Sequence, residues 1–233
     1  GDATVEGWVK WTDSFAGSPR FFDFGDRGGE IYLAALGSGT LKALVTGADG
    51  VRHRVEVPRI VSLGEWCHVA LVTGSEGMKM YFNGAPVASD PFTGSYADLK
   101  GVHNRLGRKN FVSNSPRDFQ GQIDEVRIWS AIRSEEEIRA GMFQSLTGAE
   151  PGLVALWNFE GVRDGRVTDL GGGGFHGKLE GAAKAVAAPL PGAASPAPEA
   201  DRVLDLNGDG SYVQFPDAAF EDLEEVTIEG WVK

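Results

Sequence analysis

The sequence has one cysteine, no long hydrophobic run and almost no helical periodicity, and each shortage excludes a class of structure. Cys67 has no partner for an intrachain disulfide. Because it lies in the apolar stretch 65–72, it predicts a small buried side chain rather than a reactive thiol. No stretch approaches the roughly 18 apolar residues of a membrane span, so we expect no insertion into a membrane.

Basic residues are also in short supply. The chain has 22 Lys and Arg against 33 Asp and Glu, a formal net charge of −11, and the acidic residues are dispersed. No basic stripe with interleaved aromatic residues occurs along the chain. Because an acidic surface repels a phosphate backbone, the composition argues against nucleic acid as a partner.

What the chain does contain is glycine and short strands. Its 33 glycines suit a fold with many tight turns. At residues 4–11 the side chains alternate with a period of two, the pattern of a strand. Glycine-bounded pairs of strands predict hairpins around residues 47–50 and 74–77, and Asn83 with Gly84 predicts another turn. Further strands are expected at residues 20–24, 30–36, 124–129, 203–206 and 212–215.

One helix is predicted. Ser134 and Glu137 have the spacing of a capping box, in which the hydroxyl and the carboxylate each accept a hydrogen bond from the other residue's backbone N–H. Ile138 and Met142 follow four residues apart and form one apolar stripe. The fold class is therefore all-β with one short helix.

The two ends of the chain carry the same segment. Residues 4–10 are TVEGWVK and residues 227–233 are TIEGWVK. Two equivalent strands cannot fill the same slot of one sheet, so we expect one of them to pair with a neighbouring unit. The expected inter-unit strands contain Thr4, Val5, Trp8 and Val9 at the first end, and Thr227, Ile228, Trp231 and Val232 at the second.

Residues 182–200 have a different composition, rich in alanine and proline. Proline lacks the N–H that a helix or a sheet ladder needs, so this segment cannot be a helix or a central strand. It predicts an extended linker or a long surface loop.

Several motifs resemble one family. Residues 121–129 with 134–138 resemble the closing strand and short helix of the laminin-G-like, concanavalin-A-like jelly-roll domains. Residues 64–70 and 78–84 resemble the central strand and hairpin of these domains. Residues 152–160, 169–179 and 204–213 resemble the opening of the same domain. The resemblance implies an antiparallel, two-sheet jelly-roll β sandwich.

The order of these motifs differs from that of the family. In the family the opening elements precede the EGWVK strand, whereas here they follow the closing elements. Residues 1–151 therefore resemble a sandwich that lacks its opening strands, and residues 152–233 resemble those strands. The tail can close its own body as a permuted sandwich, complete another subunit, or pair with flanking sequence of a longer polypeptide. We favour the last two, a head-to-tail array whose sheet edges are paired between units.

No catalytic constellation is evident. Related sandwich glycosidases carry paired carboxylates on one strand of a cleft, and no such spacing occurs in the predicted strands. The four histidines have no mutual metal-ligand spacing, and no Ser or Cys nucleophile has an evident base. We expect no enzymatic activity.

A calcium site is one interpretation of residues 205–210. Asp205, Asn207 and Asp209 place oxygen-bearing side chains at alternate positions, as in the first half of a calcium-binding loop. The other interpretation is a turn between two strands, since Asp and Asn tolerate left-handed backbone geometry. In the resembled family an Asp of the closing strand often binds a structural calcium, and Asp124 occupies the similar position. Its alternative roles are a turn cap or a partner for Arg127.

Aromatic residues are the third candidate site. Trp8 and its counterpart Trp231 lie on the polar face of their strands, where an indole ring can stack on a sugar. The alternative is a ring covered by a loop in a minor core. Tyr96 and Phe111 lie in loops of the kind that carry recognition in sandwiches. The pentraxin branch of the fold binds ligand through acidic residues after a Leu-Gly pair, but here bases follow Leu106, so that site is not expected.

These observations predict a non-enzymatic extracellular or cell-surface module. The first hypothesis is a structural or adhesive repeat that forms head-to-tail arrays or filaments with copies of itself or neighbouring repeats. The alternative is a lectin-like module of a larger secreted protein that binds glycans or surface glycoproteins. A structural Ca²⁺ ion is the one expected cofactor.

Overall fold

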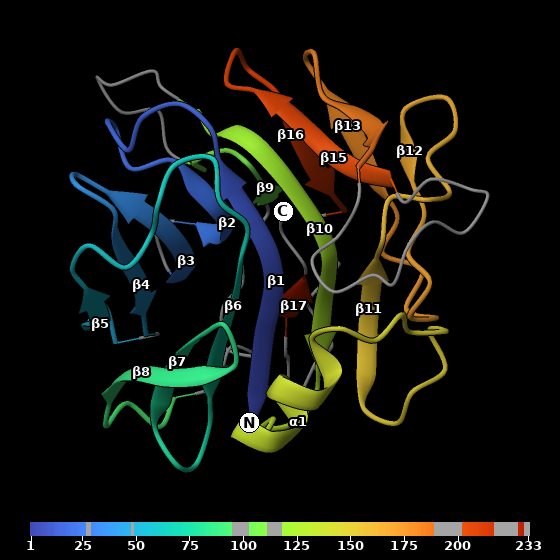
Figure 1. Ribbon diagram of the computed structural model, residues 1–233. Coiled ribbons are helices and arrows are strands. Elements are labelled where there is room, and N and C mark those ends of the chain that lie inside the picture. The colour runs from blue at the N-terminus through green and yellow to red at the C-terminus, as the bar shows by residue number, and fades with distance from the viewer. Residues whose placement is uncertain are drawn as a thin grey trace.

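The computed structural model describes residues 1–26, 29–47, 49–94, 103–110, 118–188 and 202–216, and the backbone of residues 228–230. Two sheets pack face to face in the described part of the chain (Figure 1), which confirms the predicted all-β sandwich. Sheet A contains, in spatial order, β14 (Lys184–Ala187), β15 (Arg202–Asn207), β10 (Gln120–Trp129), β17 (Ile228–Gly230), β1 (Ala3–Trp11), β6 (Cys67–Thr73), β7 (Met78–Phe82) and β8 (Ala85–Asp90), with β11 (Leu153–Trp157) also paired to β10. Sheet B contains β12 (Arg166–Val167), β13 (Gly177–Glu180), β16 (Tyr212–Phe215), β9 (Asn104–Leu106), β2 (Arg20–Asp26), β3 (Gly29–Leu36), β4 (Thr40–Thr46) and β5 (Arg52–Val57).

The predicted hairpins are confirmed. Strands β4 and β5 pair antiparallel, as do β6 and β7. Asn83 and Gly84 have φ values of 49° and 78°, the left-handed geometry that a tight hairpin turn requires, and they lead into β8. Asparagine and glycine tolerate this geometry better than other residues, which explains why the local sequence predicted the turn correctly.

The core lies between the two sheets and follows the alternation of the strands. On β6, Cys67, Val69 and Leu71 pack into the main core, whereas Ala70 and Val72 lie on the outer face of sheet A in a separate cluster with Tyr81 and Ile138. The Cys67 side chain is buried as expected, and burial raises the pKa of its thiol far above the usual range. Its predicted role as a small buried side chain is thus confirmed.

Helix α1 (Glu135–Gly141) covers the outer face of sheet A. The Ser134 hydroxyl accepts a hydrogen bond from the Glu137 N–H, and the Ser134 N–H donates to the Glu137 carboxylate at 2.8 Å, so the predicted capping box is present. Ile138 is fully buried against Ala70, Val72 and Tyr81 of β6 and β7. In the described part of the chain no helix is long and apolar enough to cross a membrane.

The tail completes the sheets of its own body. β15 pairs antiparallel with β10, and β16 pairs antiparallel with β9, so each sheet gains a strand from residues 202–216. Of the three arrangements considered from the sequence, this structure has the permuted closure. β14 also departs from the expected linker, because residues 184–187 form an edge strand ahead of the first proline of the segment. The rest of that segment, residues 189–200, lies outside the described residues.

Candidate functional site

A row of side chains crosses the outer face of sheet B. Residues directly opposite each other on neighbouring strands share a face of the sheet. The strand registers therefore align one residue from each of seven strands: Lys178, Gln214, Arg105, Asp23, Tyr32, Leu44 and Arg54. In the described part of the chain no helix covers this face, since α1 packs on sheet A. The row is the natural starting point for a functional site.

Asp23 lies at the centre of the row and is fully buried. Its Oδ2 accepts a hydrogen bond from Arg20 Nε at 3.1 Å and one from the Asn110 N–H at 3.3 Å. Burial raises the pKa of Asp23 to about 7, and the nearby Arg20 guanidinium opposes part of that effect. Burial also raises the pKa of Glu30, a carboxyl on β3 that interacts electrostatically with Asp23.

This carboxyl pair is not arranged for glycoside hydrolysis. In glycosidases the two carboxyl groups stand about 5 Å or more apart, on either side of the bond to be broken. Asp23 is fully buried, so its carboxyl does not face a bond of a sugar bound on the surface. Asp23 instead orders the centre of the face through its bonds to Arg20 and Asn110.

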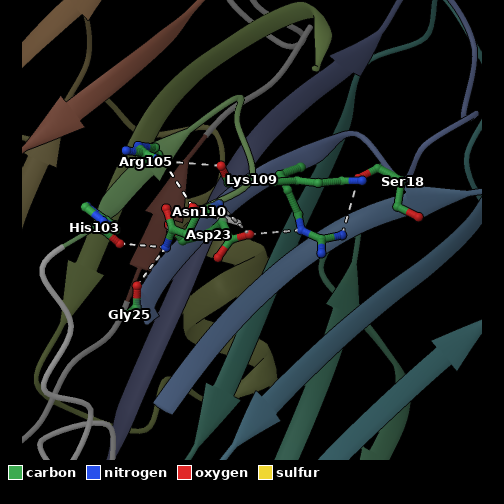
Figure 2. A network of polar contacts seen from close by, with 8 residues as sticks. Ser18, Asp23, Gly25, His103, Arg105, Lys109 and Asn110 are labelled. Atoms are coloured by element: carbon green, nitrogen blue, oxygen red, sulfur yellow. Dashed lines mark hydrogen bonds and ion pairs between the residues drawn. The ribbon is translucent and has the colours of Figure 1, made fainter. Parts of the chain in front are cut away.

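Asn110 fixes the loop that follows β9 to strand β2 (Figure 2). Its Nδ2 donates to the carbonyl oxygens of Asp23 at 3.0 Å, Gly25 at 2.9 Å and His103 at 2.6 Å. Because Asn110 is buried, these bonds satisfy carbonyls that have little access to water. The loop carrying Arg108 and Lys109 is thereby held against the face.

Arginine side chains stack on the two tyrosines of the face. The Arg20 guanidinium lies 3.5 Å from the centre of the Tyr32 ring. Arg105 and Arg108 lie 5.3 Å and 4.8 Å from the centre of the Tyr212 ring. Arg105 Nε also donates to the Gln214 side chain at 3.0 Å. Such stacking holds guanidinium groups in a defined orientation while they remain charged.

Cationic side chains outnumber carboxylates on this face. Its described residues form four ion pairs, Arg20 with Asp23, Lys42 with Glu56, Lys178 with Glu180 and Arg108 with Asp118. We call this surface the basic face. Among the described residues its cations are Arg20, Lys42, Arg52, Arg54, Arg105, Arg108, Lys109, Arg166 and Lys178, and its carboxylates are Asp23, Glu30, Glu56, Asp118 and Glu180.

Trp8, proposed from the sequence as a ligand-binding residue, is only 4% exposed. Its Nε1 donates to the Met142 carbonyl at 3.0 Å, just after α1. Its ring packs against His68 and Phe143. The ring therefore faces protein rather than an open groove, as in the minor-core alternative. Tyr96, Phe111 and Trp231, the other proposed aromatic residues, lie outside the described residues.

The residues proposed to bind a metal lie in two places, on β15 with the turn that follows it and on β10. Asn207 Oδ1 accepts hydrogen bonds from the Asp209 N–H at 3.1 Å and from the Ser211 hydroxyl, so it orders the turn after β15. Asp205 lies 3.6 Å from Lys184 Nζ. Asp124 is buried on β10, and its Oδ1 accepts from the Glu125 N–H. In the described part of the chain no group of three or more His, Cys, Asp or Glu residues is arranged to hold a metal ion.

The proposed inter-unit strands lie side by side in sheet A. Thr4, Val5 and Val9 belong to β1, which pairs with β6 and β10. The backbone of β17 runs parallel to β1, with Ile228 beside Val5. The repeated segments thus pair with each other at equivalent positions within one chain. Thr227 and Val232 lie outside the described residues.

Sequence reasoning did not identify Arg20, Asp23, Tyr32, Arg105 or Asn110. One signal was present, because Asp23 lies between Phe22 and Phe24 and so must leave the core face of an alternating strand. The sequence does not reveal which strands are neighbours, and the basic face is contributed by eight strands and a loop.

The described structure defines a class, a two-sheet β sandwich with a helix on one sheet and a polar outer face on the other. The family model described as the concanavalin A-like lectin/glucanases superfamily matches residues 1–139. The chain belongs to this superfamily, and the laminin-G-like resemblance seen in the motifs is confirmed.

Three relatives illustrate the match. The chain is 30% identical to the pentraxin-related protein PTX3 of Mus musculus over 57% of this chain and 36% of that protein. It is 29% identical to pappalysin-1 of Mus musculus over 48% of this chain and 7% of that protein. The chain thus spans about a third or less of these curated relatives. A proposed carbohydrate-binding protein from Bacteroides ovatus has the same fold, with a TM-score of 0.59 and 24% identity over 76% of this chain and 51% of that one.

Proposed function

We propose that this chain is a non-catalytic, lectin-like module that binds carbohydrate on the basic face of sheet B. The observation that carries the proposal is the row of side chains across seven strands. It combines hydrogen-bonding groups with one aromatic ring, Tyr32, which is buried beneath Arg20, and the half-buried ring of Tyr212 lies beside the row on a face that no described helix covers. Sugars are bound through such combinations of oriented polar groups and ring faces. The superfamily and the description of the Bacteroides ovatus protein are consistent with this function.

Glycan-array binding of the purified chain tests the proposal. Arg105→Ala removes the guanidinium group that bridges Gln214 and the loop after β9, so we expect loss of the array signal. Lys79→Ala is the matched control, because Lys79 lies on sheet A and, among the described residues, its side chain pairs only with exposed Glu76. Binding of no glycan, or equal binding by both variants, would refute a carbohydrate site on this face.

A second function, assembly into arrays, is favoured by the repeated terminal segments. In this chain β17 pairs with β1 at the repeated residues, and the same pairing between two chains or repeats would join them head to tail. Deletion of residues 217–233 removes the second copy but keeps β15 and β16. We expect oligomers of the full chain, measured by light scattering, to dissociate after this deletion. Unchanged association would refute strand complementation.

Two further proposals accompany the lectin function. An extracellular or cell-surface location follows from carbohydrate recognition, since surface glycans are displayed there, and protease accessibility on intact cells tests it. A structural calcium ion at Asp205, Asn207 and Asp209 is supported by their alternate spacing in the sequence. A higher melting temperature when calcium is added to chelator-treated protein would support that ion, and an unchanged melting curve would refute it.

A further inference from the structure

We propose that the basic face selects glycans that carry negative charge, as carboxylate or sulfate groups, over neutral glycans. The inference rests on the proposed carbohydrate-binding function and adds the chemical class of the ligand. Its physical basis is the separation of charge in the molecule. The whole chain has a formal net charge of −11, whereas cations exceed carboxylates on this one face.

Exposed cations lie at the ends of the row and beside them. Arg54 on β5 and Arg166 on β12 are exposed, and within the described part of the chain their side chains form no hydrogen bond or ion pair. Lys178 is also exposed, with 72% of its side chain accessible, although it contacts Glu180. Exposed cations of this kind are available to a ligand without breaking an internal bond.

The centre of the row provides oriented guanidinium groups. Arg20 Nε and Nη1 bond to Asp23 and to the Ser18 carbonyl, and the group stacks on Tyr32. Arg105 is held similarly by the carbonyls of Lys109 and Asn110 (Figure 2). It also donates to the Gln214 side chain. Within the described residues the Nη2 groups of both arginines have no protein partner. A planar guanidinium fixed in this way suits carboxylate and sulfate oxygens better than a mobile ammonium does.

The length of the row favours an oligosaccharide over a single sugar. Seven strands span six inter-strand spacings, about 29 Å at roughly 4.8 Å for each spacing. A chain molecule that crosses the strands can therefore contact Arg54, the central arginines and Lys178 together. Several spaced anionic groups along one ligand fit this arrangement.

Nucleic acid fits the molecule less well than a charged glycan. Duplex DNA carries one negative charge for about every 1.7 Å of its axis, and the remainder of this acidic protein repels a polyanion of that density. Glu30, Glu56 and Glu180 also lie on the basic face between its cations. A glycan with widely spaced charges can place each anion beside an arginine or lysine and avoid these carboxylates.

The test compares affinities, measured by isothermal titration calorimetry, for four probes. These are a heparin oligosaccharide (sulfate), an oligogalacturonate (carboxylate), a maltooligosaccharide (neutral) and a single-stranded DNA. We expect the wild-type chain to bind one or both anionic glycans at least about tenfold more tightly than the neutral glycan or the DNA, and to bind them more weakly as salt concentration rises. The sulfate and carboxylate probes show which anionic group is preferred.

Two double variants with equal net charge test whether the affinity for anionic glycans comes from the basic face. Arg54→Glu with Lys178→Glu reverses the exposed ends of the row, and we expect at least about a tenfold loss of affinity for the anionic glycan. Arg139→Glu with Lys184→Glu makes the same change on α1 and on the edge of sheet A, where both side chains are exposed, and should retain wild-type affinity.

Three outcomes would overturn the inference. The first is neutral-glycan affinity equal to or above that of the anionic probes, which leaves the carbohydrate-binding proposal intact. The second is equal loss in the two charge variants, which would indicate a general effect of net charge. The third is DNA affinity that matches the anionic glycans, which would indicate an unselective polyanion surface. Binding of no glycan at all would instead refute the proposed function itself.

Discussion

Asp23 provides a sharp test of the electrostatics at the centre of the basic face. Its carboxyl is fully buried and its pKa is raised to about 7, chiefly by burial. A carboxyl whose pKa is higher in the folded state than in the unfolded state stabilises the fold while it is protonated. That contribution is fully present below about pH 4 and is lost as pH rises towards about 7. Asp23→Asn replaces the carboxyl with a neutral group of similar shape.

The magnitude follows from the two pKa values. The pKa of Asp23 is 3.8 for the ordinary group and about 7 in the fold. Each pKa unit is worth about 1.36 kcal/mol, so this difference changes the free energy of unfolding by at most about 4 kcal/mol. No discount for solvent screening applies, because Asp23 is not exposed. Repulsion between the Asp23 and Glu30 carboxylates couples their titration, so the measured change belongs to the pair.

Urea unfolding between about pH 4 and about pH 8 measures the effect. We expect the wild-type free energy of unfolding to fall over this interval by several kcal/mol relative to Asp23→Asn. Asp49→Asn, in an exposed turn, makes the same change in net charge and serves as the control. If wild type and Asp23→Asn lose stability in parallel as pH rises, the burial argument for Asp23 is wrong.

Three other variants test separate parts of the fold. Asn110→Ala should lower the free energy of unfolding by about 2–4 kcal/mol, because it removes three hydrogen bonds from a buried amide to backbone carbonyls, and a loss under 0.5 kcal/mol in denaturant titration would contradict that role. Trp8→Phe should cost about 1–3 kcal/mol through the lost bond to the Met142 carbonyl and leave glycan affinity unchanged; reduced affinity in calorimetry would restore Trp8 as a ligand residue. Ser134→Ala should lower the free energy of unfolding by about 1 kcal/mol, because it removes the helix cap. A melting temperature equal to that of the wild type would contradict this stabilising role of the cap.

The candidate site was only partly predictable from the sequence. The alternation of β2 and β3 places Asp23 and Tyr32 away from the core, and this alternation is visible along each strand. The sequence contains no basic stripe, because no strand contributes more than two of the described cations of the face. The face forms when β9 lies between β2 and β16, which joins residues about a hundred positions apart.

For Trp8, the sequence predicted the direction of the side chain but not its exposure. Its strand position correctly suggests a ring on the polar face of β1, opposite His68 in β6. Whether that face is open depends on α1 and the residues after it, which return more than a hundred positions later to cover the ring. Local pattern determined the direction of the side chain, and tertiary packing determined its exposure.

The sequence by itself determined the elements whose causes are local. The Asn83 and Gly84 turn, the Ser134 capping box and the alternating strands all depend on residues within a few positions of one another. Only the tertiary structure decided which strands are neighbours, that residues 202–216 close the sheets of their own chain, and that scattered cations meet on one face. The physical reason is that sheet pairing is set by long-range burial of apolar faces, which many strand orders can satisfy and which no local pattern distinguishes.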